Sequence, residues 1–131
     1  MRGLDSYRQN RVFSAPNEQV VVMLFEMAIT RLESAREAME GAERGCRVKV
    51  AEDFAVVRSI YLELLNALDP EAAPEMVKNL ALTYSWVVRR LGELGREHNV
   101  EGVNGLIRVS QTLLEAFRHA AEHCNDVAEA G

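Results

Sequence analysis

The chain has 131 residues, a length typical of one domain with a hydrophobic core of its own. Apolar residues make up 48% of the chain, which excludes an intrinsically disordered protein, whereas aromatic residues make up only 6%. The net charge is −5, and the one adjacent basic pair, Arg89-Arg90, lies inside an apolar helical pattern. Because no basic face is segregated, we expect no binding to nucleic acid.

No stretch of the sequence approaches the roughly 18 consecutive apolar residues that a membrane span requires. The N-terminus also lacks an apolar signal-peptide core, since Asp5 stands where such a core would begin. The sequence therefore predicts a cytoplasmic protein without a membrane span.

The first helix is predicted to begin near Pro16, after a polar and mobile N-terminal arm over residues 1–14. Proline suits the first helical position, and Glu18 places a negative charge near the positive end of the helix dipole. Apolar residues then recur in steps that alternate between four and three, which is typical of a bundle seam. This stripe ends at Gly41 and Gly45 and consists of Val21, Phe25, Ala28, Leu32, Ala35 and Met39.

Three further stripes follow along the chain. Asp69-Pro70 breaks the second stripe, and the third helix could begin at either Pro70 or Pro74. Gly102 and Gly105 predict a weak start for the fourth helix, because glycine inside a helix costs about 1 kcal/mol relative to alanine. The stripes are Val50, Phe54, Val57, Tyr61, Leu64, Leu68; Val77, Leu80, Tyr84, Val87, Leu91, Leu94; and Leu106, Val109, Leu113, Ala116, Ala120.

Four stripes of similar length with short breaks predict an all-α, antiparallel up-down-up-down four-helix bundle. The bundle is expected to form a single domain over residues 15–131, preceded by the arm. This topology places Cys46 and Cys124 at opposite ends of helices that are about 30 Å long. A disulfide requires α-carbons within about 7 Å, so we expect none within one chain.

The histidines near the C-terminus match a zinc-protease signature, with His119, Glu122 and His123 in the pattern H-x-x-E-H. A solvated helix end is the favoured interpretation, because the third ligand and the substrate cleft that such an enzyme needs are not indicated. None of the three histidines has a glutamate three residues before it, which excludes a di-iron bundle. The sequence therefore predicts neither an enzyme nor a cofactor; adventitious metal binding at His119, His123 and Cys124 stays open.

Apolar residues also occur outside the four stripes. The first helix is apolar almost all round between Val20 and Ile29, which indicates that it is central or is covered by something else. Methionine repacks easily and suits an adaptable contact. We therefore expect a partner-binding groove, with Met23, Met27, Ile60 and Trp86 among its candidate residues.

Several segments in order resemble the FliS family of flagellin export chaperones. The similarity covers roughly residues 5–120, and the order and spacing of the segments carry it. The segments are residues 7–16 (YRQNRVFSAP), 22–29 (VMLFEMAI), 64–69 (LLNALD), and 79–91 with Asn79-Leu80, Tyr84 and Arg89-Arg90-Leu91.

The resemblance implies a cytosolic chaperone that binds the disordered C-terminal segment of flagellin and prevents its polymerisation before export. It further implies that Tyr7 and Val12 anchor an arm that covers part of the empty groove. Tyr84, Arg89 and Arg90, in the third-helix segment that carries the resemblance, are further candidate partner-binding residues. Contact with other flagellar export proteins, and a monomer or a weak homodimer, stay open. The alternative is a non-catalytic helical adaptor in secretion or signalling.

Overall fold

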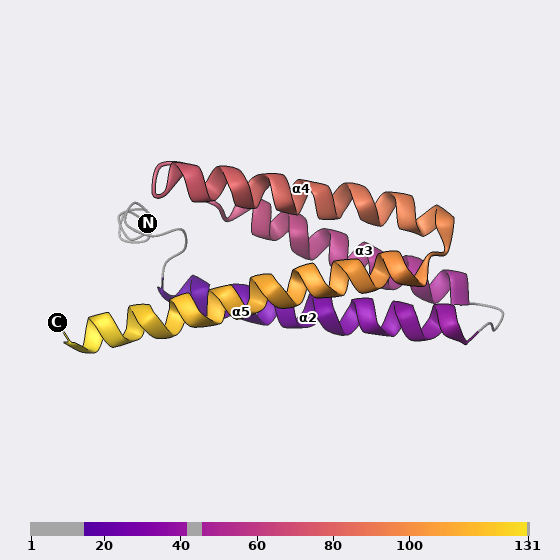
Figure 1. The fold of residues 1–131 in the computed structure, drawn as a ribbon, viewed down its shortest axis with the longest axis horizontal. Coiled ribbons are helices and arrows are strands. Elements are labelled where there is room, and N and C mark those ends of the chain that lie inside the picture. The colour runs from indigo at the N-terminus through magenta and orange to yellow at the C-terminus, as the bar shows by residue number, and fades with distance from the viewer. Residues whose placement is uncertain (1–14, 42–45, 131) are drawn as a thin grey trace.

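The computed structural model describes residues 15–41 and 46–130, with side-chain surroundings for residues 18–41 and 47–120. These residues form four helices, α2 (Ala15–Glu40), α3 (Cys46–Asn66), α4 (Pro74–Glu97) and α5 (Val100–Ala130). Neighbouring helices run in opposite directions (Figure 1), and no strand occurs in the described ranges. The prediction of an all-α fold of four packed helices is confirmed, whereas the predicted arm, with Tyr7 and Val12, lies outside the described residues.

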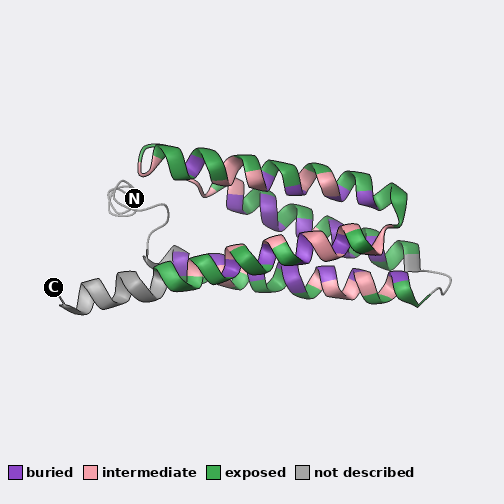
Figure 2. Cartoon of the chain, viewed as in Figure 1, coloured by how far each residue is buried: buried purple, intermediate pink, exposed green. Residues whose placement is uncertain are grey.

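The core follows the predicted seams of the first three helices, whose buried residues face the inside of the bundle (Figure 2). All six residues of the α2 seam are buried, and so are five of the six predicted in α3 and five of the six in α4. The two exceptions, Leu68 and Leu80, are half-buried. The heptad spacing therefore identified the inward faces of these helices.

The predicted seam of α5 is wrong in its face. Ala116 and Ala120 are exposed, and Val109 and Leu113 are only half-buried. Of the predicted seam only Leu106 is buried, and the other buried residues in the described part of α5 are Val103, Ile107, Ser110 and Leu114. The cause is the packing of α5, which lies extensively against α2 but touches α4 only slightly, so that its buried face turns toward α2.

The connections between helices settle two further points. Of the two possible starts for the third helix, Pro74 is the observed one, and Glu75 follows it in the first turn. The fourth helix, α5, begins at Val100, before both glycines, and the expected weakness of its start stays a prediction. The Asn99 side chain accepts a hydrogen bond from the Gly102 N–H at 3.1 Å and so caps the helix.

The two cysteines occupy the predicted positions along the fold. Cys46 is the first residue of α3, and Cys124 belongs to the last turns of α5, at the opposite end of the bundle (Figure 1). Among the described helices, none has the length and hydropathy that a membrane crossing would require.

Gly102 of α5 lies directly against side chains of α4. A β-carbon at this position would collide with Leu94 Cδ2 and would lie 3.2 Å from Arg90 Nη2. Leu94 is fully buried, so its side chain cannot move without disturbing the core. Gly105, one turn further along, has no atom within 4 Å of an added β-carbon.

We expect the two glycines to respond oppositely to alanine. Gly105→Ala should stabilise the protein by up to about 1 kcal/mol through helix propensity. Gly102→Ala should destabilise it by about 1–3 kcal/mol, because overpacking outweighs the same gain. Urea denaturation of both variants measures the difference, and equal stability would contradict the close approach.

Candidate partner-binding surface

Four aromatic rings form the centre of the bundle. Phe25 of α2 lies 6.1 Å from Tyr61 of α3, 6.2 Å from Tyr84 of α4 and 5.5 Å from Phe117 of α5, measured between ring centroids. Tyr61 and Tyr84 also contact each other edge to face at 5.6 Å. This aromatic cluster fixes the orientation of each helix, and therefore which of its faces points outward.

The two buried tyrosine hydroxyls differ in their partners. The Tyr61 hydroxyl and the Ser110 Oγ share a hydrogen bond of 2.6 Å, whereas the Tyr84 hydroxyl is buried without a hydrogen-bond partner among the described residues. Burial raises the pKa of Tyr61 to about 12, although the hydrogen bond to Ser110 opposes the shift. Burial, together with the neighbouring Tyr61, raises the pKa of Tyr84 further above its ordinary value. Both rings therefore remain neutral core groups.

We expect phenylalanine substitutions to separate the two tyrosines. Tyr84→Phe removes an unsatisfied buried hydroxyl and should leave stability unchanged or raise it by up to about 1 kcal/mol. Tyr61→Phe leaves the Ser110 hydroxyl unpaired in the core and should cost about 1–2 kcal/mol. Thermal denaturation of the two variants tests this, and a larger loss for Tyr84→Phe than for Tyr61→Phe would contradict it.

A buried carboxylate joins α2 to α3. Asp53 is fully buried, and its Oδ1 accepts a hydrogen bond from Arg31 Nη1 at 3.1 Å and lies 3.4 Å from Lys49 Nζ. Its Oδ2 has no hydrogen-bond partner among the described residues. Since a buried charge is stable only when it is paired, this interaction holds Arg31 beside the outer face of α2.

That outer face is apolar and open. Met23 is 60% exposed and Met27 is 49% exposed, and both line a shallow hollow of about 290 Å³ together with Arg31. A second hollow of about 300 Å³ lies along the line between α2 and α3, where Leu24 meets Val56 and Ile60. We call the residues Val20, Met23, Leu24, Met27, Val56 and Ile60 the α2–α3 patch.

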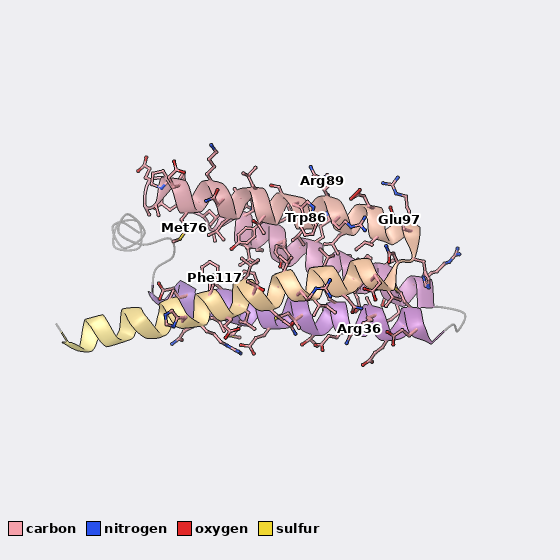
Figure 3. All side chains as sticks on the ribbon, viewed as in Figure 1. Arg36, Met76, Trp86, Arg89, Glu97 and Phe117 are labelled. Carbon is pink, nitrogen blue, oxygen red and sulfur yellow. The ribbon has the colours of Figure 1, made fainter. Side chains whose placement is uncertain are left out.

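The structure does not bring all the predicted binding residues together. Met23, Met27 and Ile60 belong to the α2–α3 patch, although only 5% of Ile60 is exposed. Trp86 and Arg89 are exposed on α4, across the bundle from α2 (Figure 3).

Two predicted residues on α4 already have contacts within the chain. Tyr84 belongs to the aromatic cluster and is fully buried. Arg90 lies 3.7 Å from a Glu93 carboxylate oxygen and 3.5 Å from one of Glu97. A direct contact of either residue with a partner therefore stays a prediction.

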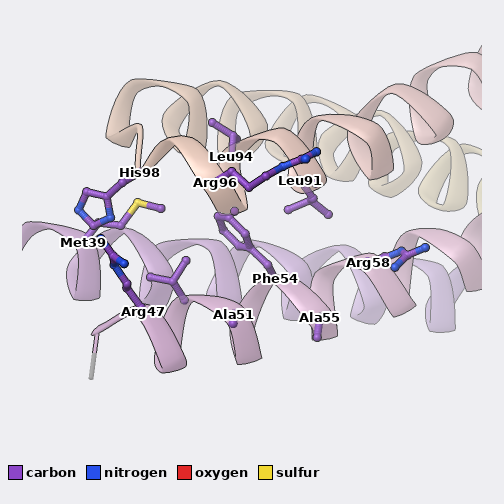
Figure 4. Close-up of a pocket in the computed structure, with 13 residues that line it drawn as sticks. Met39, Arg47, Ala51, Phe54, Ala55, Arg58, Leu91, Leu94, Arg96 and His98 are labelled. Carbon is purple, nitrogen blue, oxygen red and sulfur yellow. The ribbon is translucent and has the colours of Figure 1, made fainter. Parts of the chain in front are cut away.

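Sequence reasoning missed the largest hollow among those described, a cavity of about 550 Å³ between α3 and α4 (Figure 4). Its floor is apolar and includes Phe54 and Leu91. The signal that could have found it is the row of small residues on the facing sides of the two helices, Ala51 and Ala55 on α3 and Gly92 and Gly95 on α4.

The described residues contain no group of three His, Cys, Asp or Glu side chains that could hold a metal ion. Of the motif considered for zinc, His119 is exposed near the end of α5. The side chains of His123 and Cys124 lie outside the described residues.

An all-α bundle with open apolar surface on its helices defines the molecule as a helical-bundle binding protein. The family model of the flagellar protein FliS matches residues 1–124. The chain therefore belongs to the FliS family, which is non-catalytic. It is 27% identical over 114 residues to the flagellar secretion chaperone FliS of Campylobacter jejuni subsp. jejuni, with 87% of each chain covered. It is 26% identical over 124 residues to the flagellar secretion chaperone FliS of Escherichia coli strain K12, with 91% of this chain and 89% of that protein covered.

Proposed function

We propose that this protein is a cytosolic export chaperone that binds the C-terminal segment of flagellin through the α2–α3 patch. The observation that carries the proposal is the exposure of Met23 and Met27 beside a shallow hollow, which Glu26, Thr30 and Arg31 also line, on a helix whose opposite face is the core. Family membership supports a client in flagellar secretion. An amphipathic segment that would otherwise self-associate can cover such a patch as an added helix.

The geometry of the patch suits a helical client. Val20, Met23, Leu24 and Met27 follow each other at intervals of three, one and three residues, and so share one side of α2. Val56 and Ile60, four residues apart, continue the same surface on α3. A helix laid along this line would bury its apolar face against both helices.

The two exposed residues on α4 would form a second contact. Trp86 is 38% exposed, and Arg89 is exposed with no ion pair to a described residue. A disordered client can wrap a large surface, so one segment could reach both sides of the bundle. Aromatic and arginine side chains are frequent anchors at interfaces, which favours these two residues for the second contact.

The first test is calorimetric titration with the C-terminal segment of flagellin from the same organism. We expect saturable one-to-one binding with a negative heat-capacity change, because apolar surface is buried. The double variant Met23→Glu/Met27→Glu should lose at least about tenfold in affinity, since each charge would be desolvated at the interface.

The control for this variant is Val48→Glu, which places one such charge on a similarly exposed apolar residue of α3 outside the patch. Its affinity should equal that of the unchanged protein. If no binding occurs to the folded, unchanged protein, the chaperone proposal fails and the adaptor alternative replaces it.

The predicted arm gives a separate test. If the arm with Tyr7 and Val12 covers part of the groove, deletion of residues 1–13 removes a competitor and should tighten flagellin binding. Titration of the truncated and full-length chains under the same conditions measures the change. Equal affinities would show that the arm plays no part in client binding.

A further inference from the structure

The cavity between α3 and α4 has the form of a groove for a helix. It lies at the end of the bundle where α3 begins and α4 ends (Figure 4). Buried apolar side chains, including Phe54, Leu91 and Leu94, form its floor. The walls are low, because Gly92 and Gly95 each have no atom within 4 Å of an added β-carbon. Small residues on the walls permit a third helix to approach closely.

The rim of this groove is cationic. Arg47, Arg58 and Arg96 line it, and none of them forms an ion pair with another described residue. No carboxylate is among its lining residues, and His98 stands at its end. Such an uncompensated group of arginines stands out in a chain whose net charge is −5.

The spacing of the arginines indicates an elongated ligand. Arg47 and Arg58 are eleven residues apart on α3, which puts them on nearly the same side of the helix and about 16 Å apart along its axis. A compact anion could reach only one of them. A helix lying in the groove could place a carboxylate opposite each.

We propose that the α3–α4 groove is a docking site for an acid-flanked amphipathic helix of a partner protein other than flagellin. The partner helix has a narrow apolar stripe of small and medium side chains, with Asp or Glu on both flanks. The apolar floor favours such a helix over a phosphate backbone, and the cationic rim gives it orientation and a fast association rate. The chain's own N-terminal arm does not fit, because residues 1–14 carry Arg2, Arg8 and Arg11 against the single acidic residue Asp5.

The test uses a synthetic 18-residue helix with Leu and Ala alternating along one stripe and Glu on both flanks. A second peptide with Lys in place of every Glu is its charge control. In fluorescence anisotropy, the Glu peptide should bind saturably at low salt and more weakly as the salt concentration rises, and the Lys peptide should not bind. Equal binding of both peptides would overturn the proposal.

Two variants with matched controls locate the binding site. Gly92→Leu fills the groove while improving helix propensity, so the fold should be retained. This variant should lower the affinity for the Glu peptide at least about tenfold. Gly105→Leu makes the same change on α5, where an added β-carbon also meets no atom, and should have no effect. Arg47→Glu/Arg58→Glu should likewise abolish binding, whereas Arg108→Glu, at an exposed and unpaired arginine of α5, should not. Loss of binding in either control would overturn the assignment.

Two further measurements separate this proposal from the proposed flagellin site. The Met23→Glu/Met27→Glu variant should bind the Glu peptide normally, and the Gly92→Leu variant should bind the flagellin segment normally. Loss of flagellin binding in the Gly92→Leu variant would assign the groove to flagellin and overturn the proposal of a second partner. Self-association in sedimentation that Gly92→Leu abolishes would assign it to a second copy of the chain, and would also overturn the proposal.

Discussion

The contact of Phe25 with aromatic rings of all three other helices is the constraint on which this fold depends. The ring is fully buried and touches Tyr61, Tyr84 and Phe117, each from a different helix. Because protein interiors are close-packed, a change in the position of any one of these rings would move the helix that carries it. The aromatic cluster is also where α4, which hardly touches α5, is held to α2. The cluster therefore fixes which face of each helix points outward, and it does so without covering these outer faces.

The unequal packing around this cluster explains where the open surfaces lie. α2 packs closely against both α3 and α5, and its remaining side, with Met23 and Met27, faces outward. α4 packs mainly against α3, and near the ends of these two helices the small residues Gly92 and Ala51 leave the groove between them unfilled. The patch thus follows from the number of neighbours of α2, and the groove follows from the small residues on the facing sides of α3 and α4.

The inward faces of α2, α3 and α4 could be predicted because their heptad seams consist of large apolar residues with regular spacing. The same reasoning failed for α5, where Ala116 and Ala120 continue the period but are small enough to be stable in water or in a core. Ser110, a buried polar residue, could not be recognised from the sequence, since it is satisfied only by Tyr61 on another helix. The Asn99 cap at the start of α5 was not among the predictions, which took the two glycines that follow it as signs of a weak start.

The candidate sites show the same division between local and tertiary information. The excess of apolar residues around Met23 is a local pattern, and it correctly indicated an exposed apolar face on the first helix. The burial of Tyr84 also follows a local pattern, its place in the α4 seam, whereas its contact with Phe25 is tertiary, because it depends on where α4 meets α2. The groove is tertiary as well: Ala51 and Gly92 become its walls only because α3 and α4 bring them to facing sides.

The two surfaces have different chemistry and meet on one helix. The α2–α3 patch is rich in methionine, whereas the α3–α4 groove combines small walls with unpaired arginines. Ala55 borders the groove on one side and the hollow beside Leu24 on the other. Helices that occupy both surfaces would therefore lie next to each other across α3, separated there by the small side chain of Ala55.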